Sequence, residues 1–314
     1  MVKRAMLVWL SGALCATRGT LSAQPVLFAP GVVSTPDYER SAAFTPDGDT
    51  VYFVKRSAEP YYSVICVSAR VHGRWTTPRV AVFSGRYNDS DPAVSRDGRA
   101  LVFMSTRGGA PHLWIVHRAA GGGWTAPEAL PSPVNSDGAE MTPAFGPDGS
   151  LYFASTRPGG AGSFDLYVAH RDGHGWTTPA SLGAPNSSGF EIGPAVSPDG
   201  TLLVFMSAGR EDEMVGPGTS YSRGDLYASR KVGDAWGPPV HLPVPMNSAA
   251  AECCPSFSPD GETMYFTSER GFAMDTPERP FTWPAMETGL RSVLNGLGNI
   301  YAIPTRQVRE AATR

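Results

Sequence analysis

The 314-residue sequence predicts an all-β fold, a five-bladed β-propeller of four-stranded antiparallel blades. Three observations lead to this prediction: one motif recurs five times, an Asp-Gly turn ends each copy, and strand-like runs flank each turn. Successive turns are 50, 51, 51 and 61 residues apart, counted between Asp47, Asp97, Asp148, Asp199 and Asp260. A nearly constant period of this length is typical of architectures in which neighbouring units bury one another's hydrophobic faces.

The motif supplies the first strand and the turn of each unit. Its copies read SAAFTPDG from Ser41, DPAVSRDG from Asp91, TPAFGPDG from Thr142, GPAVSPDG from Gly193 and CPSFSPDG from Cys254. The Asp-Gly pair is typical of a hairpin turn, because Asp bonds to nearby backbone and Gly adopts positive φ. The β-branched and aromatic runs after the turns, such as VYFVKR from Val51, predict an antiparallel second strand.

Two further strands are expected in each unit. The third is SVICVSAR from Ser63, LWIVHR from Leu113, DLYVAHR from Asp165, DLYASR from Asp225 and NIYAI from Asn299. The fourth starts at the tryptophans of the first four units, which we interpret as packing residues because they repeat at the blade period: Trp75, Trp124, Trp176 and Trp236.

The fifth unit has no such fourth strand, because few residues follow Ile303. The stretch from Pro25 to Val33 occupies the corresponding place before Glu39, so we expect the N-terminal strand to complete the last blade. This closure leaves no unpaired sheet edge. It favours five blades over the alternative of six.

The domain boundaries follow from the repeat. Residues 1–23 predict a secretory signal peptide, with Lys3 and Arg4 before an apolar stretch and Leu21-Ser22-Ala23 as the cleavage site. Residues 24–304 form a single propeller domain, and residues 305–314 a C-terminal tail. The apolar stretch is shorter than the ~20 residues that cross a bilayer. We therefore expect no membrane span in the mature chain and a periplasmic or secreted location.

Composition argues against several functions. The net charge is -3 without a prominent basic run, so nucleic acid is not an expected partner. Phosphate-binding glycine loops, HExxH spacing and nucleophile elbows are absent from the sequence, so no cofactor, metal site or catalytic residue is predicted. The adjacent Cys253 and Cys254 leave two alternatives open, a pair of buried thiols or a vicinal disulfide.

The five motif copies resemble the TolB-type (WD-like) β-propeller repeat family. Its signature combines an acid, a Pro-x-Phe/Val-Ser-Pro-Asp-Gly turn, an aromatic strand and an Asp-Leu/Ile-Tyr strand, and the resemblance covers about residues 25–303. It implies a propeller fold, and it is weak for activity, because members include periplasmic partners of envelope proteins and propeller domains attached to peptidases. TolB itself combines six blades with a separate N-terminal domain, and this sequence predicts neither.

Charged residues that repeat in every unit define a candidate site. An acid lies just before each first strand: Glu39, Asp89, Glu140, Glu191 and Glu252. An arginine ends each second strand: Arg56, Arg107, Arg157, Arg210 and Arg270. Either each arginine neutralises an acid and ties blades together, or the ring of acids binds a ligand.

Two long loops, Gly209 to Gly224 and Gly271 to Gly298, are expected on the same face as the acids. Their candidate contact residues are Tyr221, Arg223, Phe281 and Trp283. The sequence thus predicts an exported, monomeric, non-catalytic propeller that binds a protein or small-molecule ligand of the cell envelope on this face. The alternative is a glycosidase-like hydrolase that uses central carboxylates. The matching environments expected for the five acids favour binding.

Overall fold

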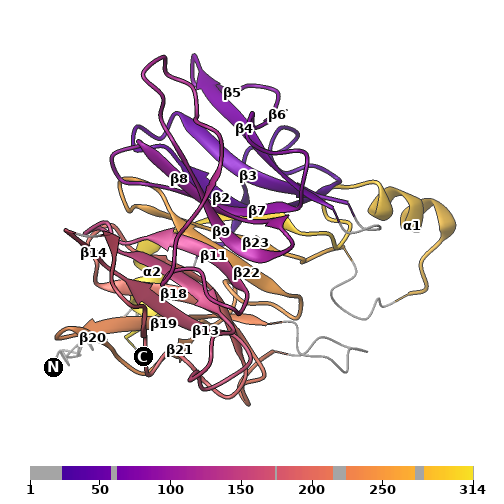
Figure 1. Cartoon of the computed structure of the whole chain (residues 1–314). Coiled ribbons are helices and arrows are strands. Elements are labelled where there is room, and N and C mark those ends of the chain that lie inside the picture. The colour runs from indigo at the N-terminus through magenta and orange to yellow at the C-terminus, as the bar shows by residue number, and fades with distance from the viewer. Residues whose placement is uncertain (1–22, 58–61, 174, 215–223, 273–278, 314) are drawn as a thin grey trace, which may run out of the picture.

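The computed structural model describes residues 23–57, 62–173, 175–214, 224–272 and 279–313. These residues form five antiparallel sheets arranged in a ring, each four strands deep from the axis to the rim (Figure 1). The structure confirms the predicted five-bladed β-propeller. The predicted signal peptide, except for Ala23, lies outside the described residues. Within the described ranges, no helix is both long and apolar enough to cross a membrane.

The three inner strands of each blade follow one another in the chain. The innermost strands are β2 (Tyr38–Phe44), β7 (Asp89–Val94), β11 (Glu140–Phe145), β17 (Phe190–Val196) and β22 (Glu252–Phe257). The second strands are β3 (Thr50–Arg56), β8 (Ala100–Gly108), β12 (Leu151–Ser155), β18 (Leu202–Ala208) and β23 (Thr263–Ser268). The third strands are β4 (Ser63–Val71), β9 (Ala110–His117), β13 (Asp165–Ala169), β19 (Asp225–Val232) and β24 (Asn299–Pro304).

The rim strands are only two residues long. They are β6 (Arg79–Val80), β10 (Glu128–Ala129), β16 (Ala180–Ser181), β21 (Val240–His241) and, in the fifth blade, β1 (Val26–Leu27). The tryptophans precede these strands, in the short pieces β5 (Arg74–Trp75), β15 (Gly175–Trp176) and β20 (Ala235–Trp236) and in an isolated bridge at Trp124. β15 pairs with β14 (Arg171–Asp172). Each tryptophan pairs with the end of the third strand or the residues just after it, so the fourth strand starts at the tryptophans as predicted and is interrupted before its rim piece.

The tryptophans pack, as the sequence predicted. A basic side chain from the end of the third strand lies over each ring: Arg70 over Trp75, Arg118 over Trp124, Arg171 over Trp176 and Lys231 over Trp236. Because the cation covers the ring face, this face is not open as a stacking platform.

The chain ends meet in the fifth blade, as predicted. Val26 pairs with Ala302 and Leu27 with Tyr301, so β1 completes the sheet of β22, β23 and β24. Phe28 then enters the contact between the fifth and first blades, where its ring lies 5.0 Å from that of Tyr265. One hydrophobic cluster fills each of the five contacts between neighbouring blades. The ring is therefore closed both by the hydrogen bonds of β1 and by the burial of hydrophobic side chains between blades.

The two helices lie on opposite sides of the ring (Figure 1). α1 (Trp283–Leu290) belongs to the connection between β23 and β24. α2 (Thr305–Ala311) follows β24 directly, and Val308, Ala311 and Ala312 join the cluster between the fourth and fifth blades. The residues expected to form a tail thus form a packed helix.

Candidate functional site

The five predicted acids are buried completely. Each accepts a hydrogen bond from a hydroxyl group of the segment that leads into its own blade. Glu140, for example, accepts hydrogen bonds from Ser136 (2.5 Å) and Ser155 (3.0 Å), and His112 of the second blade lies 2.8 Å from its Oε2. Burial raises the pKa of Glu39 and Glu252, although hydroxyl groups and cations oppose this effect.

Four arginines occupy the places that the sequence predicted. The ion pairs are Arg107–Asp89 (2.7 Å), Arg157–Glu140 (3.4 Å), Arg210–Glu191 (3.3 Å) and Arg270–Glu252 (3.2 Å). Each arginine also donates to a backbone carbonyl of the segment before its blade, as Arg157 does to Val134 at 2.6 Å. This geometry favours the structural interpretation, in which each arginine fixes the entry of the chain into its own blade.

The first blade departs from this arrangement. Lys55, one residue before the predicted Arg56, pairs with Glu39 at 3.0 Å. The Arg56 guanidinium instead lies over the Tyr38 ring, 3.6 Å from its centroid. The predicted pairing of Arg56 with Glu39 is therefore replaced by a lysine pair.

A cavity of about 380 Å³ follows the axis of the propeller. The first strands of all five blades and the turns after them line it, with Ser41 to Phe44 and Pro46 in the first blade and equivalent residues in the others. At the Asp-Gly turns, the Arg96 side chain donates across the axis to the Pro198 carbonyl at 3.2 Å. Arg96 stands where the other four units have proline. The volume lies within the ~300–1,000 Å³ of small-molecule sites.

At the end of the cavity opposite to Arg96, every first strand contains a β-bulge. The ladder register shifts in each blade, for example between Met141 and Ala144. The bulge places one residue per blade at positive φ against the cavity. We call these five residues the bulge ring: Ser41 (57°), Asp91 (53°), Thr142 (49°), Gly193 (64°) and Cys254 (57°).

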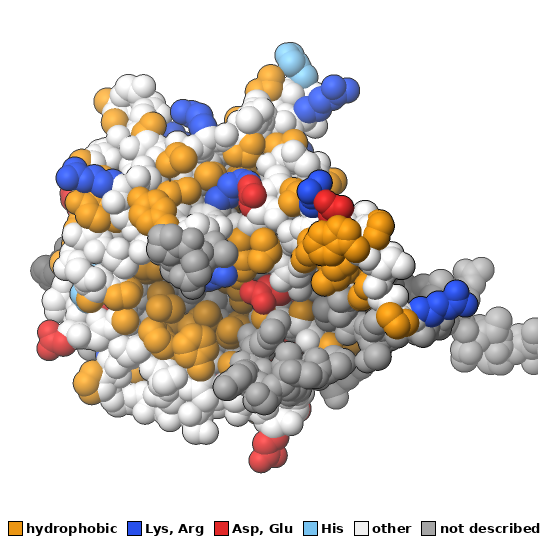
Figure 2. Space-filling model, turned by 90° about the vertical axis from the view of Figure 1, so that its right-hand side faces the viewer, with side chains coloured by type: hydrophobic (Ala, Val, Ile, Leu, Met, Phe, Trp, Pro, Cys, Tyr) orange, Lys and Arg blue, Asp and Glu red, His pale blue; other side chains and the backbone are white. Residues whose placement is uncertain are grey.

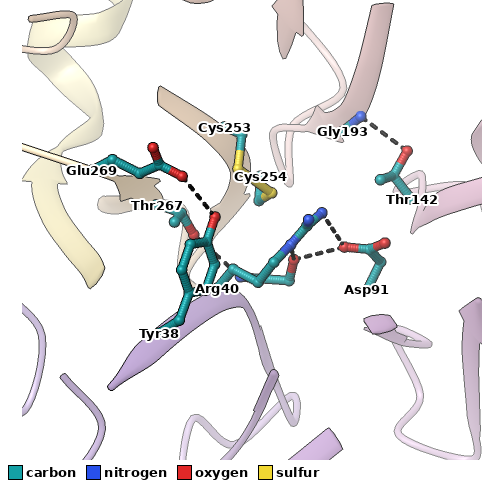
Figure 3. Close-up of a disulfide and its surroundings, with 10 residues drawn as sticks. Tyr38, Arg40, Asp91, Thr142, Gly193, Cys253, Cys254, Thr267 and Glu269 are labelled. Atoms are coloured by element: carbon teal, nitrogen blue, oxygen red, sulfur yellow. Dashed lines mark hydrogen bonds and ion pairs between the residues drawn. A yellow bond between two sulfur atoms is a disulfide. The ribbon is translucent and has the colours of Figure 1, made fainter. Parts of the chain in front are cut away.

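Positive φ costs about 1–3 kcal/mol for a residue with a side chain and is most unusual for a β-branched one such as Thr142. Neighbouring blades hold the ring in place (Figure 3). The Arg40 guanidinium donates to Asp91 at 2.7 Å, and the Gly193 N–H donates to Thr142 Oγ1 at 2.9 Å. Cys254 is joined to Cys253 by a disulfide, so the structure selects the vicinal disulfide of the two alternatives.

The sequence analysis missed the bulge ring, although a signal was present. The ring residues are the first residues of the five motif copies, and they are Ser, Asp, Thr, Gly and Cys. The three positions that follow repeat one residue type or class in nearly every copy, whereas the ring position and the position before it differ in every copy. Of these two variable positions, the ring position is the one that lines the cavity. A position that varies within a strict repeat does not serve the fold in the same way in each unit.

The connection that carries α1 lies on the same side as the bulge ring, because β23 ends beside the start of β22. Phe281 and Trp283 are exposed, Trp283 to 69%. Figure 2 shows this face, with hydrophobic side chains in several groups and charged side chains between them. The other two predicted loop residues, Tyr221 and Arg223, lie outside the described residues.

Comparisons with known proteins agree with the fold. No family model matches the chain. A curated relative, a TolB homologue of Chlorobium luteolum, is 30% identical over 117 residues, which are 37% of this chain. Over these residues the chain is similar to a TolB homologue, in agreement with the resemblance of its repeats. The match spans only 23% of that relative's length.

Two solved structures of similar fold have less similar sequences. A candidate TolB protein from Agrobacterium tumefaciens is 16% identical with a TM-score of 0.50, and the match covers 86% of this chain and 91% of that one. An α-L-arabinofuranosidase from Lactobacillus brevis is 15% identical with a TM-score of 0.52, over 87% of this chain and 92% of that one. At this identity both likenesses concern the fold alone.

Proposed function

We propose that the protein is an exported, monomeric, non-catalytic binding propeller of the periplasm or the secreted fraction. It binds a protein partner or small ligand of the cell envelope at the end of the axial cavity that carries the bulge ring. The observation that carries this proposal is the bulge ring itself, in which five blades present five different residues at one equivalent position. Unusual backbone conformations that the surrounding structure maintains are typical of ligand sites.

The surroundings of the bulge ring support a binding site. The cavity behind it is of ligand size, and Arg96 crosses its far end. The exposed aromatic residues near α1 lie on the same side and add apolar surface for a partner. The TolB-type repeats support a binding propeller in general. Export rests on the leader-like residues 1–23 and on the family resemblance.

The predicted acids have a smaller role in this proposal than the sequence analysis gave them. Their oxygens accept hydrogen bonds from groups within the blades. The acids therefore stabilise the ends of the blades and do not present a charge to a ligand. A glycosidase mechanism needs two carboxyl groups on opposite sides of the scissile bond. Among the described residues that line the cavity, Asp91 is the single acid, and it is paired with Arg40. The hydrolase alternative therefore lacks a second carboxylate in the cavity.

The experiment is capture from cell-envelope extract with the immobilised mature chain, followed by mass spectrometry of the bound proteins and small molecules. Three variants accompany it: Asp91→Ser with Thr142→Gly in the bulge ring, Phe281→Ser with Trp283→Ser beside α1, and Val232→Ser as the control. Val232 is exposed at the end of β19, away from the cavity.

We expect one species that the unmodified chain and the control retain and that the bulge-ring variant loses. Loss from the α1 variant as well would indicate a protein partner that extends over this face. Equal retention by all variants, or no specific species at all, would reject the proposal.

A further inference from the structure

We infer that the bulge ring contains a subsite for an uncharged group that both donates and accepts a hydrogen bond, a hydroxyl or a primary carboxamide. The subsite is the gap between Asp91 and Thr142. This inference rests on the proposed function, because it names the ligand chemistry of the same cavity.

The gap is defined by the contacts on the rest of the ring. Ser41 Oγ donates to Asp91 Oδ1 at 2.8 Å between the first and second blades, and the Gly193–Thr142 bond joins the third and fourth. Gly193 packs against Cys254, where an added Cβ would lie 3.4 Å from the Cys254 nitrogen. The Ser41 N–H donates to Thr267 of the fifth blade at 3.3 Å. Within the described ranges, no hydrogen bond joins Asp91 to Thr142.

Asp91 presents an acceptor to this gap. Its Oδ1 accepts from both Ser41 and Arg40, whereas its Oδ2 has no donor within the described part of the chain. The side chain is 8% exposed and lines the cavity. An ionised carboxylate can accept hydrogen bonds on both oxygens, so Oδ2 is suited to receive one from a ligand in the cavity.

Thr142 presents a donor. Its Oγ1 accepts the Gly193 N–H, which leaves the hydroxyl proton without an acceptor in the described residues. Thr142 is also buried and lines the cavity. Both side chains lie on the same side of the ring in Figure 3, with Thr142 beside Gly193 and Asp91 beside Arg40. The gap thus offers one acceptor and one donor.

Charge decides which ligand groups fit. Arg40 already neutralises Asp91, so an ammonium or guanidinium would meet a like charge, and it cannot accept a hydrogen bond from Thr142. A carboxylate can accept that bond but has no proton to donate to Asp91 Oδ2. A hydroxyl or carboxamide both donates and accepts without a net charge.

The rest of the ligand should be narrow and apolar. The residue after the ring position is Ala42 in the first blade and proline in the others, Pro92, Pro143, Pro194 and Pro255, and all five line the cavity. These side chains offer no hydrogen bond. A short alkyl chain with a neutral polar head is therefore the simplest probe.

The experiment compares four compounds with the same three-carbon chain attached to different heads: butan-1-ol, butanamide, butylammonium and butanoate. Ligand-observed NMR with the mature chain measures their dissociation constants. We expect butan-1-ol and butanamide to bind about tenfold more tightly than the two charged compounds, the ratio that ~1.4 kcal/mol produces. Comparison of the first two decides between a hydroxyl and a carboxamide. Equal or tighter binding of a charged compound would overturn the inference.

Variants taken from the repeat itself provide the controls. Thr142→Ser keeps the hydroxyl, whereas Thr142→Gly removes it and installs the residue that the fourth blade has at Gly193. We expect Thr142→Ser to retain binding and Thr142→Gly to lose about fivefold, with an unchanged or higher melting temperature. Binding that is the same in both variants would contradict the role of Thr142.

The two proposals fail separately. If the neutral probes bind as expected but envelope extract provides no specific species, only the proposed cellular ligand is rejected. If the extract provides a species that depends on the bulge ring while the four probes bind alike, only the subsite is rejected.

Discussion

The acids and the bulge ring lie two residues apart on the same five strands, yet they differ in almost every respect. The acids are alike in all blades, fully buried, and bonded mostly within their own blade. The ring residues differ in all blades, line the cavity, and bond to neighbouring blades. In this propeller, the repeated acids build each blade, whereas the varied residues of the bulge ring face a shared space.

The physical reason is that a buried charge tolerates little variation. A carboxylate removed from water must keep its donors, so each blade retains the acid and a cation near it. A residue that lines the cavity has no such requirement, so its type can vary between blades to suit the binding of a ligand. The predictions below test this difference, from the largest expected effect to the smallest.

Removal of one cation should have the largest effect on stability. We expect Arg157→Met to lower the free energy of unfolding by about 3–5 kcal/mol, because Glu140 would remain buried with less compensation. Denaturation by urea measures the change. If Arg157→Met lowers the free energy of unfolding less than the bulge-ring variant Thr142→Gly does, the acid–arginine pairs are not the residues that stabilise the blades.

Gly193 tests the conformation of the bulge ring. Gly193→Ala should cost about 1 kcal/mol, because φ is +64°, a backbone conformation that residues with a side chain rarely adopt. The matched Thr142→Gly should change stability little, since relief of the backbone is offset by the lost hydrogen bond. Thermal unfolding of both variants checks these signs. A neutral Gly193→Ala would mean that the ring is not constrained.

The His241–Asp225 pair of the fourth blade is a second departure from the repeat, and its effect on stability should depend on pH. His241 Nε2 lies 2.6 Å from Asp225 Oδ2, and this hydrogen bond raises the pKa of His241. Asp225 also accepts the Met214 N–H, so the pair helps to hold the segment after β18.

Because the folded pKa is raised, the stabilisation by His241 is complete below the unfolded value of about 6.5 and is lost as pH rises through the folded value. The melting temperature of the unmodified chain should exceed that of His241→Gln more at about pH 5.5 than at about pH 8.5. A difference that does not change with pH would exclude this linkage.

The smallest effect is expected at Ser256. Its Oγ is buried without a hydrogen-bond partner in the described residues, and the equivalent residues of the other blades are Ala43, Ala93, Ala144 and Ala195. Ser256→Ala should be neutral or stabilise by up to about 1 kcal/mol, because an unsatisfied hydroxyl is removed. The melting temperature of this variant, measured by calorimetry, shows whether alanine is tolerated at position 256 as in the other blades. Clear destabilisation would show that the hydroxyl has a partner.

Much of the molecule could be predicted because the repeat is local. The turns, the order of the strands and the closure by Val26 and Leu27 follow from spacing and from the need to pair sheet edges. The pairing of Glu39 could not be predicted in the same way. Lys55 and Arg56 are adjacent and chemically similar, and the alternation of side chains along β3 decides which of them reaches the acid.

The sequence by itself determined the blade, its number of copies and the residues that each blade shares, since these depend on periodic burial and turn chemistry within about fifty residues. Only the tertiary structure decided which side chains meet around the axis. The bulge shifts the register within each first strand, so the acid lies in its blade while the residue two positions later faces the cavity. Contacts such as Arg40–Asp91 exist only because neighbouring blades pack against each other around the axis, and they are absent from any single repeat.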